Sequence, residues 1–307
     1  MIANYLYRTW AKNIFHSLIL PISCCVLTLH PPARAAADVP ATATLPGAAS
    51  SGPSSATMTA FSSATDGQPP KPWRAVGLPK GKAPLTRMDV AVLDGERVLR
   101  LATDKSYGTL SHALPALALG AQATLRWKWR VDQGLPGADM RRKEGDDSPL
   151  RVCAMFDLPL DNLGLVERTL MRLARSVSGE ALPGATLCYV WDHQLPSGTL
   201  LPNPYTRRVR FIVLNSGDSP LGTWVSHERR LAADFLRAFK DDLGNLSASA
   251  AQGNPTNATN ATNGTNATSG GNDSTRLPPL VAIVVGADSD NTGGASLSYI
   301  GDVVLKP

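Results

Sequence analysis

The stretch ATLRWKWRV at residues 123–131 alternates large apolar and basic side chains with a period of two. One face carries Leu125, Trp127, Trp129 and Val131, and the other carries Arg126, Lys128 and Arg130. Because successive side chains of a β-strand point to opposite faces, this pattern predicts a strand with one buried and one solvated face. Such half-buried strands are typical of antiparallel sheets.

Six further stretches with turn residues at their ends are predicted as strands: 98–102, 151–156, 185–191, 209–214, 280–285 and 296–305. Apolar residues at helical spacing predict two helices, one over 162–179 and one over 228–243. The chain has no long alternation of strands and helices, which argues against a parallel sheet. We therefore expect an all-β fold, an antiparallel jelly-roll-like β-sandwich with two inserted or flanking helices.

The charge balance argues against one class of partner. The formal net charge is +5, but Arg8, Lys12 and Arg34 lie in an N-terminal segment that we expect to be removed. Of the 30 basic residues 27 then remain against 25 acidic ones, and they form no long basic stripe. We therefore expect no nucleic-acid partner.

Residues 1–37 have the features of a signal peptide. Arg8 and Lys12 precede an apolar run at 17–29, and small residues at 33–37 offer cleavage sites. A lipoprotein signal at Cys24 is an alternative, although the usual leucine three residues earlier is absent. No later stretch has the roughly 20 apolar residues that a membrane helix needs. We expect a periplasmic or secreted protein without a transmembrane segment in the mature chain.

The composition divides the rest of the chain into three parts. Residues 38–70 consist largely of Ala, Ser, Thr, Pro and Gly and are predicted to be a disordered linker. The β-sandwich domain is expected over 71–307, interrupted by a low-complexity loop at 247–275. Asn-Ala-Thr repeats in this loop fit the acceptor pattern for N-glycosylation. Because the leader is of bacterial type, we interpret them as an expanded surface repeat.

Two cysteines, Cys153 and Cys188, remain after removal of the leader. Each lies in the middle of a predicted strand, and we expect the two strands to be neighbours. An oxidising compartment would permit a disulfide between them. The alternative is two buried cysteines that never meet, since cysteine is often buried without pairing.

Common catalytic motifs are missing from the sequence, so no catalytic residue is assigned. Three polar clusters are candidates for a binding site. The first comprises Asp146 and Asp147 with Arg151 at the head of a strand, and the second is DSDNTG at 288–293. The alternating oxygen side chains of the second, Asp288, Asp290 and Asn291, resemble the start of a calcium loop, although its terminal Glu is missing. The third is NPYT at 203–206, in which Tyr205 could stack on a sugar ring or fill a corner of the sandwich.

Several motifs in this order resemble a family of exported proteobacterial proteins that is defined only as a domain of unknown function. They are WKWRV at 127–131, KEGDD at 143–147, RVCAMFD at 151–157, YVW at 189–191, NPYT at 203–206, Trp224, Asp234, DSDNT at 288–292 and YIGD at 299–302. The resemblance covers about residues 73–305, and it implies no activity. A weaker resemblance links the closing YIGDV to carbohydrate-binding jelly rolls. It implies that Asp302 serves a structural calcium. With Asp288 and Asp290 of the calcium-loop-like stretch, Asp302 completes the predicted metal ligands, and no other cofactor is expected.

Three functions compete on these grounds. The leading hypothesis is a non-catalytic envelope protein that binds a glycan or another polar ligand through Asp146, Asp147, Arg151, Tyr205, Asp290 and Asn291. The alternative is a polysaccharide-active enzyme, a hydrolase or lyase, that uses Asp146, Asp147 or Asp157 near Arg151. The third is a structural partner of other envelope proteins, which requires an exposed apolar patch. If the clusters around Asp147 and Asp290 form one binding site, they have to lie together at one end or face of the sandwich, as we expect.

Overall fold

The computed structural model describes residues 58–159, 168–169, 183–217, 220–251 and 277–306. The predicted signal peptide, most of the predicted linker and all but two residues of the first predicted helix lie outside these residues. So does most of the low-complexity loop. Within the described residues, no helix is both long and apolar enough to cross a membrane.

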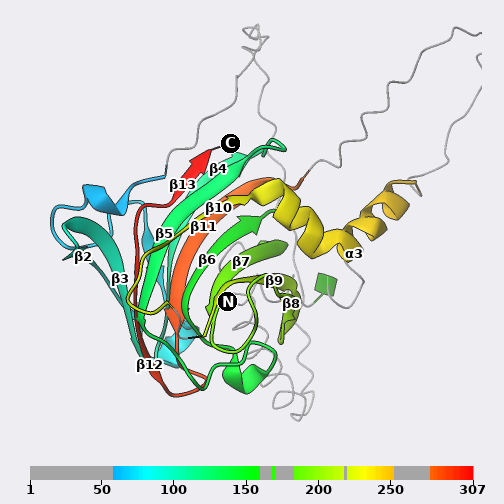
Figure 1. Cartoon of the computed structure of the whole chain (residues 1–307). Helices are drawn as coiled ribbons and strands as arrows, with labels where there is room; N and C mark the ends of the chain where they lie inside the picture. Colours follow the sequence, from blue (N-terminus) through cyan, green and yellow to red (C-terminus); the bar gives the residue numbers. More distant parts are fainter. Residues whose placement is uncertain (1–57, 160–167, 170–182, 218–219, 252–276, 307) are drawn as a thin grey trace, which may run out of the picture.

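Two β-sheets make up most of the described chain (Figure 1). The larger contains, in spatial order, β1 (Arg74–Val76), β4 (Tyr107–Leu117), β11 (Leu280–Asp288), β6 (Ser148–Phe156), β7 (Ala185–Asp192), β9 (Thr206–Ser216) and β8 (Leu200–Asn203). The smaller contains β10 (Val225–Arg230), β5 (Thr124–Gln133), β12 (Ala295–Ile300), β3 (Glu96–Asp104) and β2 (Arg87–Leu93). A short strand, β13 (Val304–Lys306), also pairs with β5. The described residues also form three short 3₁₀ helices: Phe61–Ser63, Pro79–Gly81 and Lys143–Gly145.

The main core lies between the sheets and follows from the alternating pattern of β5. Trp127 and Trp129 are buried, and the Trp127 ring lies 5.2 Å from that of Tyr189 on β7. Trp129 lies 6.1 Å from Trp191 and donates a hydrogen bond to Asn215. The basic face of β5 points outward, where Arg126 and Lys128 form ion pairs with Glu228 and Glu96. The sequence pattern therefore predicts both faces of β5 correctly.

One strand pair departs from the antiparallel arrangement that the sequence predicts. β7 pairs with β9 in parallel, whereas β8 pairs antiparallel with β9. In the sheet, β9 lies between β7 and β8. It therefore has β7 as a parallel neighbour on one side and β8 as an antiparallel neighbour on the other. Individual strand patterns do not reveal this insertion, because they carry no information on spatial order.

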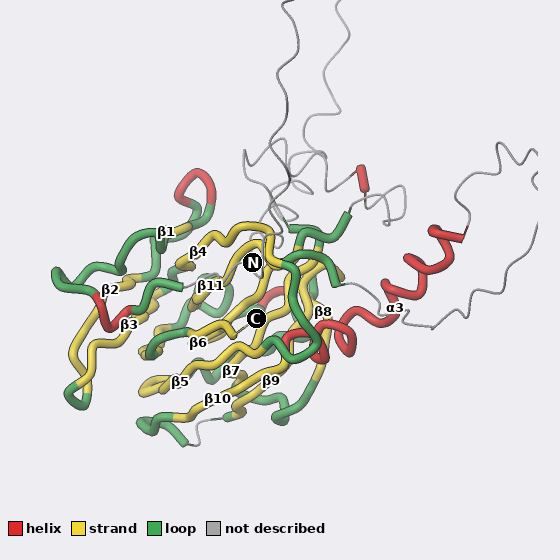
Figure 2. Tube along the Cα trace, turned by 90° about the horizontal axis from the view of Figure 1, so that it is seen from above, coloured by secondary structure: helices red, strands yellow, loops and turns green. Residues whose placement is uncertain are grey.

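The second predicted helix begins later than expected and is α3 (Leu231–Ala251). Residues up to Arg230 belong to β10, which pairs with β5 along its whole length. α3 starts directly after β10 and extends away from the sheets (Figure 2). Its first turns are anchored by Asp234, which accepts hydrogen bonds from Tyr189 and Arg229, and by the buried Phe235, 4.4 Å from Phe156. The helix also includes residues 247–251, which we expected in the low-complexity loop.

The predicted linker ends too late, because residues 58–70 belong to the folded part of the chain. Phe61 is completely buried, and its ring lies 4.8 Å from that of Trp73. Trp73 donates a hydrogen bond to the carbonyl of Thr59 at 2.7 Å. Ser62 bonds to Asp302, near the other end of the chain. Met58, Phe61 and Ala64 of this stretch are therefore buried against the domain.

The closing stretch 296–305 is also divided differently from the expectation. It forms β12 and β13 rather than one strand, because Gly301 leaves the ladder and donates its N–H to the carbonyl of Lys128.

Five strands were not predicted: β1, β2, β4, β8 and β10. β4 contains Gly108 and Pro115, residues that are more typical of turns than of a long central strand.

Candidate functional site

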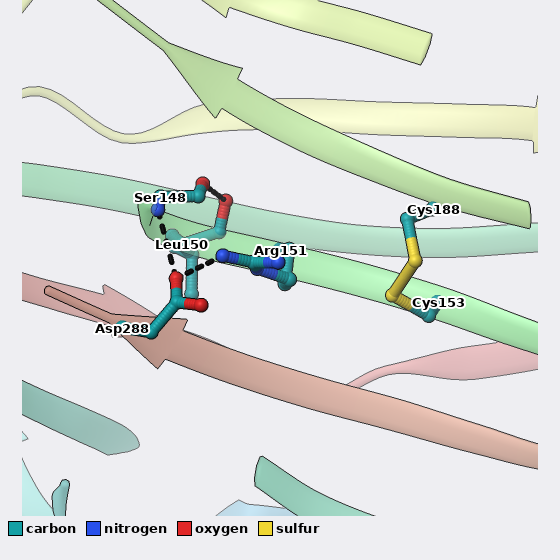
Figure 3. The surroundings of a disulfide bond; sticks show 6 residues. All are labelled: Ser148, Leu150, Arg151, Cys153, Cys188 and Asp288. Atoms are coloured by element: carbon teal, nitrogen blue, oxygen red, sulfur yellow. Dashed lines mark hydrogen bonds and ion pairs between the residues drawn. A yellow bond between two sulfur atoms is a disulfide. The ribbon is translucent and has the colours of Figure 1, made fainter. Parts of the chain in front are cut away.

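The two predicted acidic clusters meet at one end of the larger sheet, where β6 begins and β11 ends (Figure 3). The Arg151 guanidinium contacts the Asp288 carboxylate, which also accepts the N–H of Ser148 at 2.8 Å. Asp147 accepts hydrogen bonds from the backbone and side chains of Asn291 and Thr292 at 2.6–3.2 Å. The structure thus joins the loop before β6 to the turn after β11 through these carboxylates.

Asp146 extends the same cluster toward the turn between β8 and β9. Its carboxylate accepts a hydrogen bond from Asn203 at 2.9 Å, and its carbonyl accepts one from Asn291. Burial raises the pKa of Asp146 to about 6, although the nearby Arg151 opposes the rise. Asp146 is therefore inside the protein and does not face solvent.

Tyr205 is also placed differently from a sugar-stacking residue. The side chain is buried, and its hydroxyl donates to the carbonyl of Lys143 at 2.8 Å. The Lys143 ammonium lies 5.2 Å from the ring centre. Tyr205 thus packs the loop before β6 against the β8–β9 turn, which is the corner-filling alternative.

Buried polar atoms without a hydrogen-bond partner among the described residues mark this cluster. They include Nε and Nη1 of Arg151, the hydroxyl of Tyr107 and Oδ1 of Asn291. Tyr107 pairs with Asp288 across β4 and β11, and burial followed by the charge of Asp288 raises its pKa well above the usual value. Burial likewise raises the pKa of Asp288, while Arg151 opposes the rise. The sequence analysis missed Tyr107 because it missed β4.

Asp302 does not belong to this cluster, which corrects the predicted metal set. Its carboxylate instead accepts hydrogen bonds from the N–H and hydroxyl of Ser62 at 2.9 and 2.6 Å. Among the described residues, a group of carboxylates close enough to share one ion consists of Asp147, Asp288 and Asp290. The resemblance to jelly rolls suggested Asp302, whereas the fold brings in Asp147.

Cys153 and Cys188 are paired across β6 and β7 and form a disulfide (Figure 3). Both lie on the face of the larger sheet that also carries Arg151, turned away from the main core. Apolar residues buried around them include Met140, Val190, Phe211 and Val284. The disulfide therefore covalently joins two central strands close to the acidic cluster.

The surface of the described residues includes two grooves of ligand size. The larger, about 540 Å³, lies over β5 and β10 and is hereafter the β5–β10 groove. Its lining consists of Glu96, Arg126, Trp127, Lys128, Ser226, His227, Glu228, Asp302 and Val304. The second, about 460 Å³, lies between the end of β5 and the turn after β11 and includes Asp132, Leu135 and Thr292. Asp146, Asp147 and Asp157 are absent from the lining of both.

Beside the β5–β10 groove lies Trp224, a partly exposed aromatic residue just before β10. Its indole N–H donates to Asp94 at 3.0 Å, and the Lys128 ammonium lies 5.1 Å from the ring centre. Lys128 also pairs with Glu96 at 2.5 Å. An aromatic ring, carboxylates and cations are therefore gathered on one exposed surface. The alternating basic residues of β5 were a signal for it that the sequence analysis treated only as a solvated face.

The model of a family described as "Protein of unknown function (DUF3047)" matches residues 71–266. No curated protein matches the chain. Among solved structures, the family 11 xylanase from Neocallimastix patriciarum is similar at 10% identity and a TM-score of 0.23, with 76% of this chain and 98% of that chain covered. A likeness at this TM-score supports no conclusion about activity.

Proposed function

The chain belongs to the DUF3047 family of proteins of unknown function, and from the geometry of this member we propose a non-catalytic module that binds a glycan or another polar ligand. The ligand would lie in the β5–β10 groove, against Trp224. We further propose that the module works in the bacterial envelope. The chain passes repeatedly between the two sheets, as from β3 to β4 and from β11 to β12, which supports a jelly-roll-like connection of the sandwich.

The observation that carries this proposal is the combination of Trp224 with both signs of charge around the groove. Ligand sites are typically concave, with a volume of about 300–1,000 Å³ and a few well-placed polar groups. Sugar rings have an apolar C–H face and a rim of hydroxyls. An indole ring would suit the face, while Glu228 and Arg126 could accept and donate hydrogen bonds at the rim.

The buried acidic cluster is less suited to a glycan. Asp146, Asp147 and Arg151 are at most 2% exposed, so a polysaccharide would have to unfold the loops above them to make contact.

Catalysis by these carboxylates is also poorly supported. A glycosidase needs two carboxyl groups about 5–10 Å apart across a cleft. Asp147 and Asp157 lie at opposite ends of the nine-residue strand β6, and at about 3.3 Å per residue they are far beyond that separation. In the β5–β10 groove, Glu96 and Glu228 are each held in an ion pair with a cation. Binding is therefore the better-supported function.

The structural-partner hypothesis finds little support among the described residues. Their large exposed apolar side chains are Leu85, Val92, Leu236 and Val304, which lie on separate elements. Isolated apolar residues are normal on protein surfaces, and a docking site needs a contiguous patch.

Two observations support export. The first 37 residues have the pattern of a signal peptide, with Arg8 and Lys12 before an apolar run. The disulfide between Cys153 and Cys188 fits an oxidising compartment, since such bonds are rare in the cytosol.

A glycan array with the purified mature protein tests the binding function, followed by titration of each glycan that binds. We expect Trp224→Ala and Arg126→Gln each to weaken binding at least about tenfold, the effect of losing roughly 1.4 kcal/mol. Arg87→Gln is the matched control, because Arg87 is an exposed arginine beside Asp89 on the distant strand β2. If both Trp224→Ala and Arg126→Gln bind with the affinity of wild type, the groove is ruled out as the binding site. Release of sugar fragments by wild type but not by Glu228→Gln would favour the enzyme instead.

A further inference from the structure

Three carboxylates at the junction of β6 and β11 are close enough to surround a single ion. One oxygen from each of Asp147, Asp288 and Asp290 lies within 4.8 Å of the other two. Calcium–oxygen distances are about 2.3–2.6 Å, so two ligands on opposite sides of one ion lie about 5 Å apart. The spacing of the three oxygens thus fits one coordination sphere.

Positive charge beside the three candidate ligands comes from the buried Arg151. Asp147 and Asp288 are at most 2% exposed, and Arg151 contacts Asp288. Burial of carboxylates is unfavourable unless hydrogen-bond donors or positive charge compensate them. A bound cation would add positive charge beside Asp147, Asp288 and Asp290 and help them to stay ionised.

Two unpartnered oxygens form an observation independent of the acidic cluster. Asn291 donates both hydrogen bonds from Nδ2, to the Asp146 carbonyl and to Asp147, which identifies its other amide atom as the acceptor oxygen. This Oδ1 is buried and has no donor among the described residues. The hydroxyl of Tyr107, a residue only 4% exposed, likewise has no partner there. Tyr107 lies directly opposite Asp288 across β4 and β11, so the two side chains are on the same face of the sheet, beside the cluster.

We propose that Asp147, Asp288 and Asp290 bind a calcium ion, with Oδ1 of Asn291 as a further ligand. All of these ligands are oxygens, which Ca²⁺ and Mg²⁺ prefer, whereas Zn²⁺ favours nitrogen and sulfur. Calcium accepts six to eight ligands in flexible geometry, which suits ligands from a strand end and two loops. Magnesium demands a near-ideal octahedron and loses its water reluctantly.

Such an ion would connect two parts of the chain that are far apart in sequence. Asp147 precedes β6, and Asp288 and Asp290 end β11 and begin the following turn. Thr292 of this turn lines the second groove, so calcium would also stabilise one wall of that groove. This inference does not depend on glycan binding in the β5–β10 groove.

The purified mature protein, freed of metal with EDTA, is the material for the test. Titration calorimetry with CaCl₂ is expected to show one site, and at about 100 times the Kd the melting temperature should rise by about 5–10 °C. Asp290→Asn is the test variant, because Asp290 is the least buried of the three. We expect it to weaken calcium binding at least tenfold. Asp302→Asn, outside the cluster, is the matched control and should bind calcium like the wild type.

Each outcome decides for or against the site. Absence of both heat and thermal stabilisation in the wild type overturns the proposal, since protons would then balance the buried charge. Unchanged affinity in Asp290→Asn overturns the ligand assignment, and tighter binding of MgCl₂ than of CaCl₂ overturns the choice of calcium. If circular dichroism shows Asp290→Asn to be unfolded, Asn291→Ala replaces it, with the same expected loss of affinity.

Discussion

The guanidinium of Arg151 contacts the carboxylate of Asp288, although 137 positions separate the two residues in the sequence. Both side chains are at most 3% exposed, so neither charge is compensated by water. The pair joins two central strands of the larger sheet. Removal of either side chain leaves the other as a buried charge without its partner.

Arg151→Met should therefore reduce the free energy of unfolding by about 3–5 kcal/mol, measured by urea denaturation in EDTA. Methionine keeps much of the volume but leaves Asp288 without its cation. The double variant Arg151→Met/Asp288→Asn should recover a large part of the loss. If the single and double variants are equally unstable, the two charges are not coupled. Arg87→Met, at an exposed pair with Asp89, serves as the control and should change stability by less than about 1 kcal/mol.

The disulfide is expected to stabilise the domain mainly by restricting the unfolded chain. Cys153 and Cys188 are 35 positions apart, and a loop of this size corresponds to about 3–4 kcal/mol. The double variant Cys153→Ala/Cys188→Ala should show this loss in urea denaturation. Wild type in a strong reductant should behave in the same way, and a wild type that is indifferent to reductant would contradict the prediction.

His227 should make the protein less stable in mild acid. Burial, followed by the positive charge of Arg229, lowers the pKa of His227 to about 4 from 6.5. Between these two values the unfolded chain binds the proton more readily than the folded one, so stability falls as the pH falls from 6.5 to 4. Acidic residues of raised pKa, such as Asp146, act in the opposite direction, and the measurement has to separate them.

The separation comes from comparing His227→Gln with wild type. The difference between their unfolding free energies should change steadily between pH 6.5 and 4, in favour of the variant at low pH. Val92→Ala, which changes an exposed side chain that does not titrate, is the control and should give a difference that is independent of pH. A parallel pH dependence of His227→Gln and wild type would contradict the assignment.

Phe61 should contribute to stability although it lies in a stretch of small residues. Phe61→Ala removes a completely buried ring that contacts Trp73, and loss of such a ring costs about 3–5 kcal/mol. Val92→Ala removes apolar atoms from a side chain that is 69% exposed and should change stability by less than about 0.5 kcal/mol. Equal effects of the two variants, measured by thermal unfolding, would mean that residues 58–64 do not pack on the domain.

The sequence predicts best those strands whose two faces differ, and β5 is the clearest case. Its Trp and Arg residues alternate, so both faces were assigned correctly. β6 and β7 are buried along their whole length and were recognised as apolar runs. The second half of β10 was lost to the helix prediction because an acidic residue such as Glu228 suits the first turn of a helix. Pairing with β5 overrides this local preference, and only the tertiary structure supplies the partner.

The candidate site, too, was predicted where a local sequence pattern exists and missed where it depends on tertiary contacts. That Asp147 and Asn291 would meet was suggested by acidic residues at strand ends, and the hydrogen bonds between them show how. Tyr107 and Trp224, which lies beside the groove, were not assigned to a site, because their positions depend on which strands are neighbours. Asp302 was assigned from a resemblance, and its actual partner, Ser62, lies 240 positions away. Contacts at such separations have no local pattern in the sequence.

The central position of β11 also determines when the protein can fold during its synthesis. β11 lies between β4 and β6, yet it begins only at Leu280, so the larger sheet stays split until residues 280–288 have left the ribosome. β12 has the same place between β3 and β5. Folds dominated by such long-range pairings form slowly. The growing chain would thus remain unfolded while it is being made, which is the state in which a polypeptide can be threaded through a narrow export channel.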